Sequence, residues 1–430
     1  MSNNQIRQHN GKPQQRMNVM TKPIGPACNI DCTYCYYLSK QQLLDYDKGC
    51  KPTMNPEMLE RYIRTYIEQQ NFPEIVFHWQ GGEPTLLGVK FFREVVKLQK
   101  KYCPPGVTIE NDLQTNGILL DDEWGKFLAK NKFLVGISID GPEMIHNTYR
   151  TNRAGRGTFK QTMKGIDILH KHNVNFATLT CVNNVSGAEP LAVYRFLRDV
   201  VRSSQMQFIP IVEAKSFRDT APQYWDEAEI LFQGAPEAEP GHPDSVVEAW
   251  CVSAGQWGDF LCTIFDEWLN EDIGKINVPY FEAAIEAWMG RVNPLCTLGP
   301  MCGKGLAIEA NGDVFACDHY VYPDFKLGNI KQDDLQDMQF SEKQQAFGYA
   351  KESTLPDQCR QCDYQFACFG ECPKNRLLKT LQGQKGLNYL CAGWNKFFRH
   401  IDPYITLVVN TMGHKVYKKI NRHAMQLKLK

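Results

Sequence analysis

Hydrophobic and polar positions follow two alternating periods along residues 54–212 of this 430-residue chain. In NPEMLERYIRTYIEQQ, Asn55 can cap a helix and Pro56 suits its first turn. The apolar residues that share one face of this helix are Leu59, Tyr62, Ile63 and Tyr66. Short β-rich runs alternate with such helices: EIVFHW, VTIENDLQT, FLVGISI, VNFATLTCV and MQFIPIV. Strands separated by helices pair in parallel, so the pattern predicts an open doubly wound sheet or a full or partial barrel, with its site at the carboxyl ends of the strands.

The pattern changes after the last of these strands. Residues 213–244 are rich in Pro, Ala and acidic residues, which indicates a linker or a substrate-covering loop. A helix is predicted from about 245 to 270, and cysteines dominate residues 296–391 on a Gly-rich background. We therefore expect a barrel-like unit over 17–244 that ends in the substrate-side loop, a connecting helical segment over 245–295, a metal-organised domain over 296–395 and a basic C-terminal helix or tail over 396–430.

Composition excludes several classes of partner. Lys plus Arg and Asp plus Glu each number 48, so no global field attracts nucleic acid or acidic lipid. Mean hydropathy is −0.41, no apolar run approaches bilayer length, and the polar start MSNNQIRQHNGKPQQR lacks the apolar core of a signal peptide. We expect a cytoplasmic protein with no membrane partner, in which sixteen cysteines serve metal or redox chemistry rather than disulfides.

Three cysteines with the spacing Cys28-x3-Cys32-x2-Cys35 lie in GPACNIDCTYCYYLSK. Structural zinc takes four closed ligands, and a distant fourth ligand is compatible with this spacing. The alternative is a [4Fe–4S] cluster on three thiolates, which leaves one iron open to a small molecule, whereas electron-transfer clusters usually have four protein thiolates.

With Tyr34 before its last cysteine, this motif resembles that of the radical S-adenosylmethionine superfamily, in which the methionyl amine and carboxylate chelate the open iron. WQGGEP, directly after a predicted strand, resembles the segment that receives the methionyl group, although a Gly-Gly-Glu-Pro turn alone is usually an ordinary loop. ISIDGPEMIHNTYR resembles the ribose and carboxylate contacts of peptide-acting members, while Asp140 within it can simply start a turn. The resemblance implies cofactor contacts from Tyr34, Gln80, Gly81, Gly82, Glu83, Asn116, Ser138, Arg150 and Ile211.

Seven later cysteines and one glycine resemble the SPASM extension of this superfamily. The matching pattern is Cys302-x9-Gly312-x4-Cys317, then Cys359-x2-Cys362-x5-Cys368-x3-Cys372, then Cys391, with Cys296 as an eighth thiol. Eight thiolates suffice for two further [4Fe–4S] clusters, which makes three in all, although Cys-x2-Cys also suits a zinc knuckle. The resemblance assigns Cys296, Cys302, Cys317 and Cys372 to the nearer auxiliary cluster and Cys359, Cys362, Cys368 and Cys391 to the farther one.

From about residue 17 to 395 the chain is most similar to the anaerobic sulfatase-maturating enzymes, through MTKPIGPACNIDCTYCYYL, WQGGEPTL, SIDGP…HNTYR and CDHYVYPDFKLGNI. This resemblance implies a partial parallel (β/α)6 barrel followed by a SPASM iron–sulfur domain. It implies the oxidation of a Cys or Ser in a sulfatase to Cα-formylglycine, by a 5′-deoxyadenosyl radical that abstracts hydrogen from Cβ. Asp318 matches the proposed base of the family, and otherwise it is an exposed turn residue.

The implied partners are an unfolded sulfatase segment of the Cys/Ser-x-Pro-x-Arg type and an external one-electron reductant such as flavodoxin or ferredoxin. Two alternatives remain open at this point. One is a SPASM peptide maturase that forms thioether or carbon–carbon cross-links in a precursor peptide. The other is a non-catalytic iron–sulfur electron carrier or scaffold, which predicts a fourth protein ligand for the first cluster.

Overall fold

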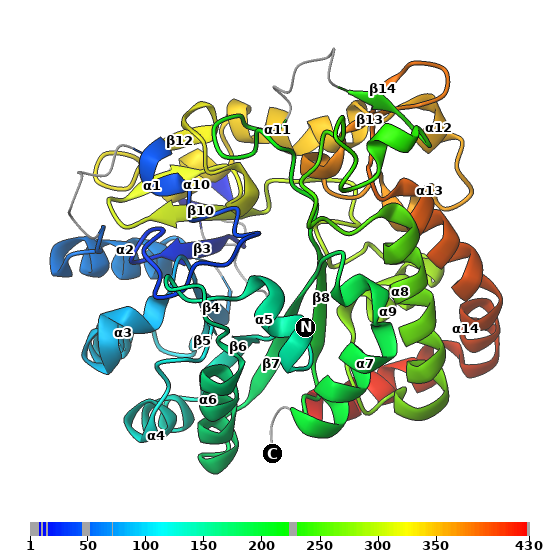
Figure 1. Ribbon diagram of the computed structural model, residues 1–430. Coiled ribbons are helices and arrows are strands. Elements are labelled where there is room, and N and C mark those ends of the chain that lie inside the picture. Colours follow the sequence, from blue (N-terminus) through cyan, green and yellow to red (C-terminus); the bar gives the residue numbers. More distant parts are fainter. Residues whose placement is uncertain are drawn as a thin grey trace.

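A nine-stranded sheet forms the centre of the protein in the computed structural model, which describes residues 8–9, 12–13, 16–44, 52–70, 72–222 and 230–427, with side chains from residue 16 to residue 410 (Figure 1). Its strand order is β12-β11-β10-β3-β4-β5-β6-β7-β8. The six strands from β3 to β8 run parallel and form the partial barrel predicted from the sequence. They are β3 (Asn18–Lys22), β4 (Glu74–Trp79), β5 (Thr108–Thr115), β6 (Leu134–Ser138), β7 (Phe176–Val182) and β8 (Met206–Pro210).

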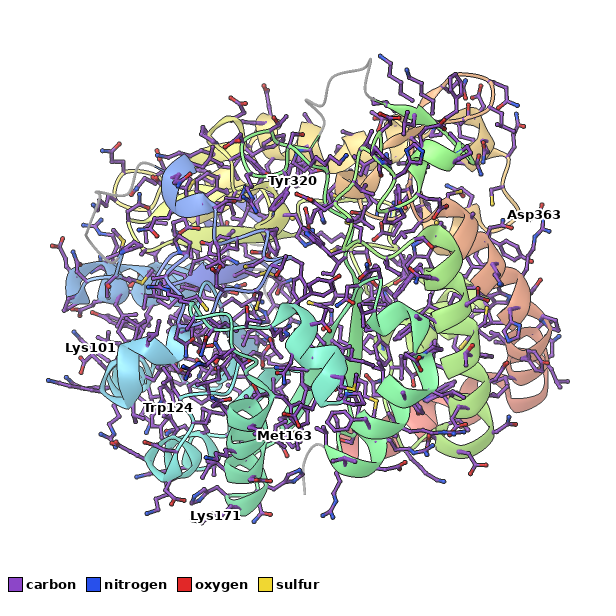
Figure 2. The ribbon with its side chains drawn as sticks, in the orientation of Figure 1. Lys101, Trp124, Met163, Lys171, Tyr320 and Asp363 are labelled. Atoms are coloured by element: carbon purple, nitrogen blue, oxygen red, sulfur yellow. The ribbon has the colours of Figure 1, made fainter. Side chains whose placement is uncertain are left out.

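Helices cover the outer face of this sheet: α2 (Pro56–Glu68), α3 (Gly88–Tyr102), α4 (Asp122–Lys130), α5 (Glu143–Tyr149), α6 (Phe159–Lys171) and α7 (Pro190–Arg195). The predicted first helix is confirmed, because the Asn55 side chain accepts the Met58 N–H and the predicted apolar face is buried. In β4, Phe77 and Trp79 alternate toward these helices. Figure 2 shows Trp124 of α4 packed inward, whereas Lys101 and Lys171 project outward.

The connecting segment contributes α8 (Ala254–Glu267) and α9 (Pro279–Trp288), which lie beside α14 (Cys391–Leu427). The helix expected from about residue 245 begins only at Ala254, because Ser253 and Gln256 form a capping box there. Helices α8 and α14 approach closely at Gly258 and Gly393, where an added Cβ on either glycine would lie about 3 Å or less from backbone of the other helix. No helix of the described chain combines the length and the apolarity that a membrane span requires.

The cysteine-rich region is continuous with the barrel. Strand β10 (Gly305–Glu309) pairs in parallel with β3, and β11 (Asp313–Phe315) and β12 (Lys326–Asn329) extend the same sheet by antiparallel pairing. The remaining elements are β1 (Gln8–His9), β2 (Lys12–Pro13), β9 (Leu231–Phe232), β13 (Leu378–Lys379), β14 (Lys385–Leu387), α1 (Lys40–Leu43), α10 (Leu335–Gln339), α11 (Glu342–Ser353), α12 (Asp357–Arg360) and α13 (Gln365–Cys368), with short 3₁₀ and π turns between some of them. Of the substrate-side loop predicted over 213–244, residues 223–229 lie outside the described chain.

Candidate active site

The three cysteines of the first motif lie on the loop that leaves the carboxyl end of β3. The backbone of this loop is tied to the segment after α5, because Asp31 N–H donates to Thr151 O over 2.8 Å and Thr33 N–H to Tyr149 O over 3.1 Å. Cys35 N–H donates to Cys32 O over 3.0 Å, which turns the loop back on itself. The loop therefore presents its thiols at the end of the barrel where active sites of parallel sheets lie.

The electrostatic environment of these thiols fits a cationic group between them. Burial, together with the charges of Glu83 and Cys35, raises the pKa of Cys28 to about 12, although backbone hydrogen bonds oppose the shift. Burial likewise raises the pKa of Cys32 and Cys35. Three thiolates are costly here unless bound iron compensates their charge, and a cluster with three protein ligands supplies that compensation.

The WQGGEP segment packs directly on this loop. Gly82 N–H donates to Gly25 O over 2.7 Å, and Glu83 N–H donates to Ala27 O over 2.9 Å. A Cβ on Gly82 would lie 2.0 Å from Ala27 O, and Gly81 has φ +123°, so the close approach requires both glycines. A Cβ on Gly81 would also lie 3.4 Å from Lys22 Cα. The segment thus joins β3, β4 and the cysteine loop, and Gln80 N–H completes the link by donating to Thr21 O over 2.8 Å.

Glu83 is buried and accepts hydrogen bonds from residues at the ends of neighbouring strands. Its Oε1 accepts from Thr85 N–H, Thr85 Oγ1 and Thr115 Oγ1, and its Oε2 accepts from Asn116 N–H over 2.8 Å. Burial raises the pKa of this carboxyl group, although the four donors oppose the shift. Asn116 Nδ2 in turn donates to Asn29 Oδ1 over 2.7 Å and lies 4.0 Å from Cys28 Sγ.

Arg150 and Asp140 form a buried ion pair next to the same cysteines. Arg150 Nε lies 3.0 Å from Asp140 Oδ2, and Arg150 Nη1 lies 4.0 Å from Cys32 Sγ. Tyr34 donates its hydroxyl hydrogen to Asp140, and Asp140 Oδ1 accepts Cys181 N–H over 3.1 Å. Asp140 is therefore a fully buried organising residue, whereas sequence reasoning also allowed a simple turn.

The remaining predicted contacts lie at the carboxyl ends of later strands. Ser138 ends β6, and its Oγ accepts from Gln114 Nε2 over 2.9 Å. Ile211 follows β8, is 8% exposed, and donates its N–H to Val182 O over 2.9 Å. The nine residues predicted to contact a cofactor thus follow the rim from the cysteine loop along β4, β5 and β6 to β8.

Asp318 lies on the side of the site formed by the cysteine-rich region and contacts two residues of the barrel. Its carboxylate forms an ion pair with Lys22 and accepts the Tyr36 hydroxyl over 2.6 Å. Burial alone would raise the pKa of Asp318, but the charge of Lys22 and the hydrogen bonds from Lys22 and Tyr36 hold it below its usual range. Asp318 is therefore a partly buried, ionised carboxylate, with its side chain 14% exposed, rather than an exposed turn residue. No motif pointed to Lys22 or Tyr36, which only tertiary contacts identify.

The eight later cysteines fall into two groups of electrostatic neighbours. The pKa of Cys317 is raised by burial and by the charges of Cys296 and Cys302, and that of Cys372 by burial, Glu371, Cys302 and Cys317. Burial raises the pKa of Cys391 to about 12, with further effects from Cys359 and Cys362, and Cys368 neighbours Cys391 and Cys359. The structure thus brings together Cys296, Cys302, Cys317 and Cys372 in one group and Cys359, Cys362, Cys368 and Cys391 in the other.

The eight later thiols differ in exposure. Cys296 is exposed, whereas the other seven are buried or partly buried. Among the residues described, no three His, Cys, Asp or Glu side chains are grouped as a single metal ion requires. A single zinc ion binds thiolates at about 2.3 Å, and a four-iron cluster separates its thiolates more widely than one ion does.

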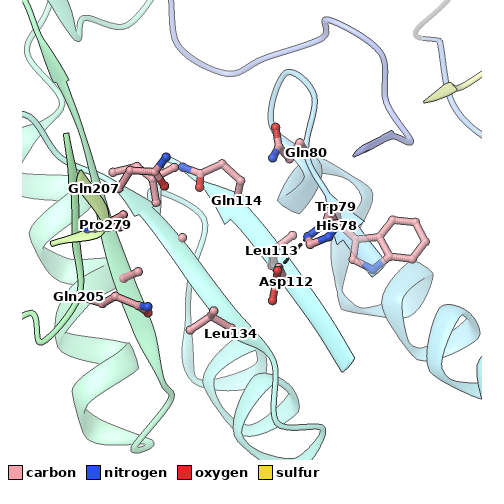
Figure 3. Close-up of a pocket in the computed structure, with 13 residues that line it drawn as sticks. His78, Trp79, Gln80, Asp112, Leu113, Gln114, Leu134, Gln205, Gln207 and Pro279 are labelled. Atoms are coloured by element: carbon pink, nitrogen blue, oxygen red, sulfur yellow. Dashed lines mark hydrogen bonds and ion pairs between the residues drawn. The ribbon is translucent and has the colours of Figure 1, made fainter. Parts of the chain in front are cut away.

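A cavity of about 210 Å³ with a mixed polar and apolar lining lies inside the barrel beneath this rim (Figure 3). Gln80 and Gln114 line its upper part, and one layer lower His78 Nδ1 lies 2.9 Å from Asp112 Oδ2. Gln205 and Gln207 of the β8 region line the opposite wall. Closed parallel barrels fill this space with branched apolar side chains, whereas this interior contains a cavity in which polar side chains lie among apolar ones.

Comparisons with known proteins agree with this geometry. Residues 23–197 match the Radical SAM superfamily, and residues 296–363 match SPASM, an iron–sulfur cluster-binding domain. A serine-type anaerobic sulfatase-maturating enzyme of Bacteroides thetaiotaomicron is 43% identical over 90% of both chains. A serine-type enzyme of Klebsiella pneumoniae is 32% identical over 89% of this chain and 87% of its own, and a cysteine-type enzyme of Clostridium perfringens is 28% identical over 92% and 99%.

Solved structures give the same result for the fold. Native anSMEcpe with bound AdoMet aligns with a TM-score of 0.77 at 28% identity, over 92% of this chain and 100% of that chain. The complex of native anSMEcpe with AdoMet and the Cp18Cys peptide aligns with a TM-score of 0.76 at 28% identity, over 92% and 99% of the two chains. The likeness therefore spans the barrel and the cysteine-rich region together.

Proposed function

This chain belongs to the anaerobic sulfatase-maturating enzymes, radical S-adenosylmethionine enzymes with a SPASM domain, and we propose that it oxidises a serine or cysteine of a sulfatase to Cα-formylglycine. The substrate is an unfolded segment of the Cys/Ser-x-Pro-x-Arg type. Serine is the favoured target, because the relatives at 43% and 32% identity are serine-type enzymes, whereas the cysteine-type relative is 28% identical.

The donor sets support three [4Fe–4S] clusters in this proposal. Cys28, Cys32 and Cys35 hold the cluster that binds S-adenosylmethionine, and the two groups of four later cysteines hold the auxiliary clusters. When bound, the first cluster and S-adenosylmethionine supply an electron and a carbon-centred radical that can remove hydrogen from the substrate Cβ. Cleavage of S-adenosylmethionine would consume one electron, and conversion of the substrate radical to the aldehyde would release one, which an auxiliary cluster could accept; an external one-electron donor such as flavodoxin or ferredoxin would first reduce the S-adenosylmethionine cluster.

The rim residues position the cosubstrate in this proposal. Gly81 and Gly82 let backbone approach the methionyl group, and Glu83 receives its amine. Ser138 binds the ribose, and Arg150 lies close enough to the cysteine loop to receive the carboxylate. Tyr34, Gln80, Asn116 and Ile211 complete the contacts around the methionyl and adenosyl groups.

One observation carries the catalytic part of the proposal: Asp318 is a partly buried carboxylate held ionised between Lys22 and Tyr36. An ionised carboxylate at this position can accept the proton of the substrate hydroxyl or thiol. Lys22 and Tyr36 orient its two oxygens, so the proton acceptor is fixed before the substrate arrives. The proposed cellular location is the cytoplasm, where thiols remain reduced.

Mass spectrometry of an anaerobic reaction tests this function. The reaction contains reconstituted enzyme, dithionite, S-adenosylmethionine and a peptide with Ser-x-Pro-x-Arg, and a parallel reaction contains Cys-x-Pro-x-Arg. A hydrazine-reactive aldehyde together with 5′-deoxyadenosine establishes formylglycine formation, and the ratio of the two peptide rates establishes the target residue. A thioether or carbon–carbon cross-link without aldehyde contradicts the proposed product, and the absence of 5′-deoxyadenosine at full iron loading contradicts radical chemistry altogether.

A further inference from the structure

The chain crosses from one group of auxiliary cysteines to the other within five residues. Cys368 neighbours Cys391 and Cys359, whereas Cys372 neighbours Cys302 and Cys317. The three residues between Cys368 and Cys372 all have left-handed backbone: Phe369 with φ 47°, Gly370 with φ 69° and Glu371 with φ 49°. Residues other than glycine adopt this conformation only where the surroundings enforce it.

The side chain of Arg376 holds residues 369–371, the left-handed segment that we call the crossover, in place. Its Nη2 donates to Phe369 O over 3.2 Å, its Nε to Gly370 O over 3.4 Å, and its Nη1 to Thr354 Oγ1 over 3.1 Å. The guanidinium is packed so closely that a Cβ on Gly370 would lie 2.9 Å from Nη2. Two amides support the other end of the crossover, because Asn375 Nδ2 and Asn388 Nδ2 both donate to Glu371 Oε2.

The charge of Arg376 faces both groups of thiols. The side chain is 8% exposed, and its hydrogen-bond acceptors in the described chain are neutral carbonyl and hydroxyl oxygens. The ionisable groups that interact electrostatically with its guanidinium include Cys359 of one group and Cys302 and Cys372 of the other, which are thiolates when they ligate iron. A fixed cation therefore lies between the two groups, shielded from water.

A second buried cation faces one group alone. Lys351 is 1% exposed, and its Nζ donates to Cys296 O over 2.6 Å and to Thr297 O over 2.8 Å. Its charge is the strongest of those that stabilise the thiolates of Cys296 and Cys302. The nearer group thus has two buried cations beside it, whereas Arg376 is the buried cation next to the farther group.

We propose that Arg376 is a positioning residue that holds the left-handed crossover and, as a shared buried charge, raises the reduction potentials of both auxiliary clusters. The physical reason is that a reduced cluster carries one more negative charge, which a nearby cation in a poorly screened interior stabilises. Lys351 adds to this effect on the nearer cluster only. The inference depends on the proposed ligand groups, and it goes beyond the proposed function because it concerns the potentials rather than the product.

The experiment uses the full chain with Cys28, Cys32 and Cys35 changed to Ala, so that only the auxiliary clusters remain. Iron content first tests the ligand groups, with eight irons per chain expected for two clusters. Midpoint potentials are then measured by redox titration with electron paramagnetic resonance for this background and for Arg376→Gln, Arg376→Lys and Lys351→Gln. Arg360→Gln is the control for an exposed charge, because this arginine also interacts electrostatically with Cys359 but water screens its exposed side chain.

We expect Arg376→Gln to lower both midpoint potentials, Arg376→Lys to leave both near the background values, and Lys351→Gln to lower one of them. Arg360→Gln should change neither. Equal shifts in the Gln and Lys variants of Arg376, or no shift in the Gln variant at full iron loading, would overturn the role of the charge. If Arg376→Gln loads less iron, the Lys variant decides: normal loading and potentials uphold the proposal, and a loss there as well overturns it. Formylglycine assays are separate, so failure of the proposed function leaves this result interpretable.

Discussion

The Tyr36 hydroxyl donates to Asp318 Oδ2 over 2.6 Å, although 282 positions separate the two residues in the sequence. Tyr36 directly follows the last cysteine of the first motif, and Asp318 directly follows Cys317 of the SPASM region. This hydrogen bond therefore connects the loop proposed to bind the S-adenosylmethionine cluster with a residue next to an auxiliary cluster. It also orients the carboxylate that the proposed mechanism uses as a base.

Tyr36→Phe should slow aldehyde formation about tenfold, the effect of one lost hydrogen bond of about 1.4 kcal/mol to a charged group. Asp318→Asn should slow it by at least about a hundredfold, because the proton acceptor itself is lost. The measurement is the initial rate of aldehyde formation by mass spectrometry, together with 5′-deoxyadenosine release. Tyr349→Phe, an exposed tyrosine of the same region, should behave as wild type. Equal rates for Tyr36→Phe and wild type would contradict the orienting role.

Gly82→Ala should remove the first cluster and leave the auxiliary clusters in place. The new Cβ would lie 2.0 Å from Ala27 O, a backbone atom, so the collision can be relieved only by moving the loop that carries Cys28. Anaerobic iron analysis should show a loss equivalent to one cluster. Gly255→Ala is the control, because its nearest neighbour is Ser253 Oγ at 3.8 Å. Full iron content in Gly82→Ala would show that the close approach is unnecessary.

Gly136→Ala should weaken S-adenosylmethionine binding through an intermediate residue. A Cβ there would lie 2.1 Å from Gln114 Oε1, and displacing this amide breaks its hydrogen bond to Ser138 Oγ. Loss of one neutral hydrogen bond of about 1 kcal/mol predicts a roughly fivefold higher Kd, measurable by equilibrium dialysis. In a Gln114→Ala background the same substitution should have little further effect. Additive effects of the two changes would contradict this route.

His146 should make the stability of the barrel depend on pH. Burial lowers the pKa of this imidazole from its ordinary value of 6.5 to about 4, and Asp140 N–H donates to its Nδ1. Because the unfolded chain binds the proton more readily, the full stabilisation is present above about pH 6.5 and is lost as pH falls toward about 4. The loss amounts to about 3 kcal/mol at low pH.

The test compares thermal midpoints at pH 7 and pH 5 for wild type and His146→Asn under anaerobic conditions. Wild type should lose more of its Tm between the two pH values than the variant does. Both proteins experience the same acid lability of their clusters, so the difference isolates the imidazole. Parallel decreases in the two proteins would show that His146 does not carry this dependence.

Local patterning predicted most of the barrel because each element carries its own signal. Asn55 and Pro56 mark the start of α2, and Phe77 and Trp79 alternate with polar residues as β4 requires. The predicted start of α8 was nine residues too early, and the observed start coincides with the capping box of Ser253 and Gln256, which is a local signature within the sequence. The pairing of β10 with β3 could not be predicted, because each is a five-residue strand and almost the whole barrel lies between them in sequence.

Some residues of the candidate site can likewise be recognised from short sequence patterns, whereas others are identified only by the structure. The cysteine spacings and WQGGEP are visible as sequence because their chemistry depends on short intervals. Lys22 and Arg376 act through tertiary contacts or backbone conformation, for which the sequence has no local mark, whereas Asp140 lies within a motif but its buried ion pair with Arg150 is visible only in the structure. The separation of Cys372 from Cys368 is only partly visible in the sequence. Their close spacing would place both thiols in one group, and only the left-handed crossover places them in different groups.

The parallel pairing of β3 with β10 limits how this enzyme can be recombined with its relatives. An exchange at residue 295 would join a foreign β10 to the resident β3, and the register from Gly305 opposite Asn18 to Glu309 opposite Lys22 would have to be re-formed across the joint. Lys22 would then meet a foreign partner at the position of Asp318. Functional chimaeras should therefore need the segment from β3 to Tyr36 transferred together with the cysteine-rich half. Two segments that are far apart in the sequence thus have to come from the same parent protein.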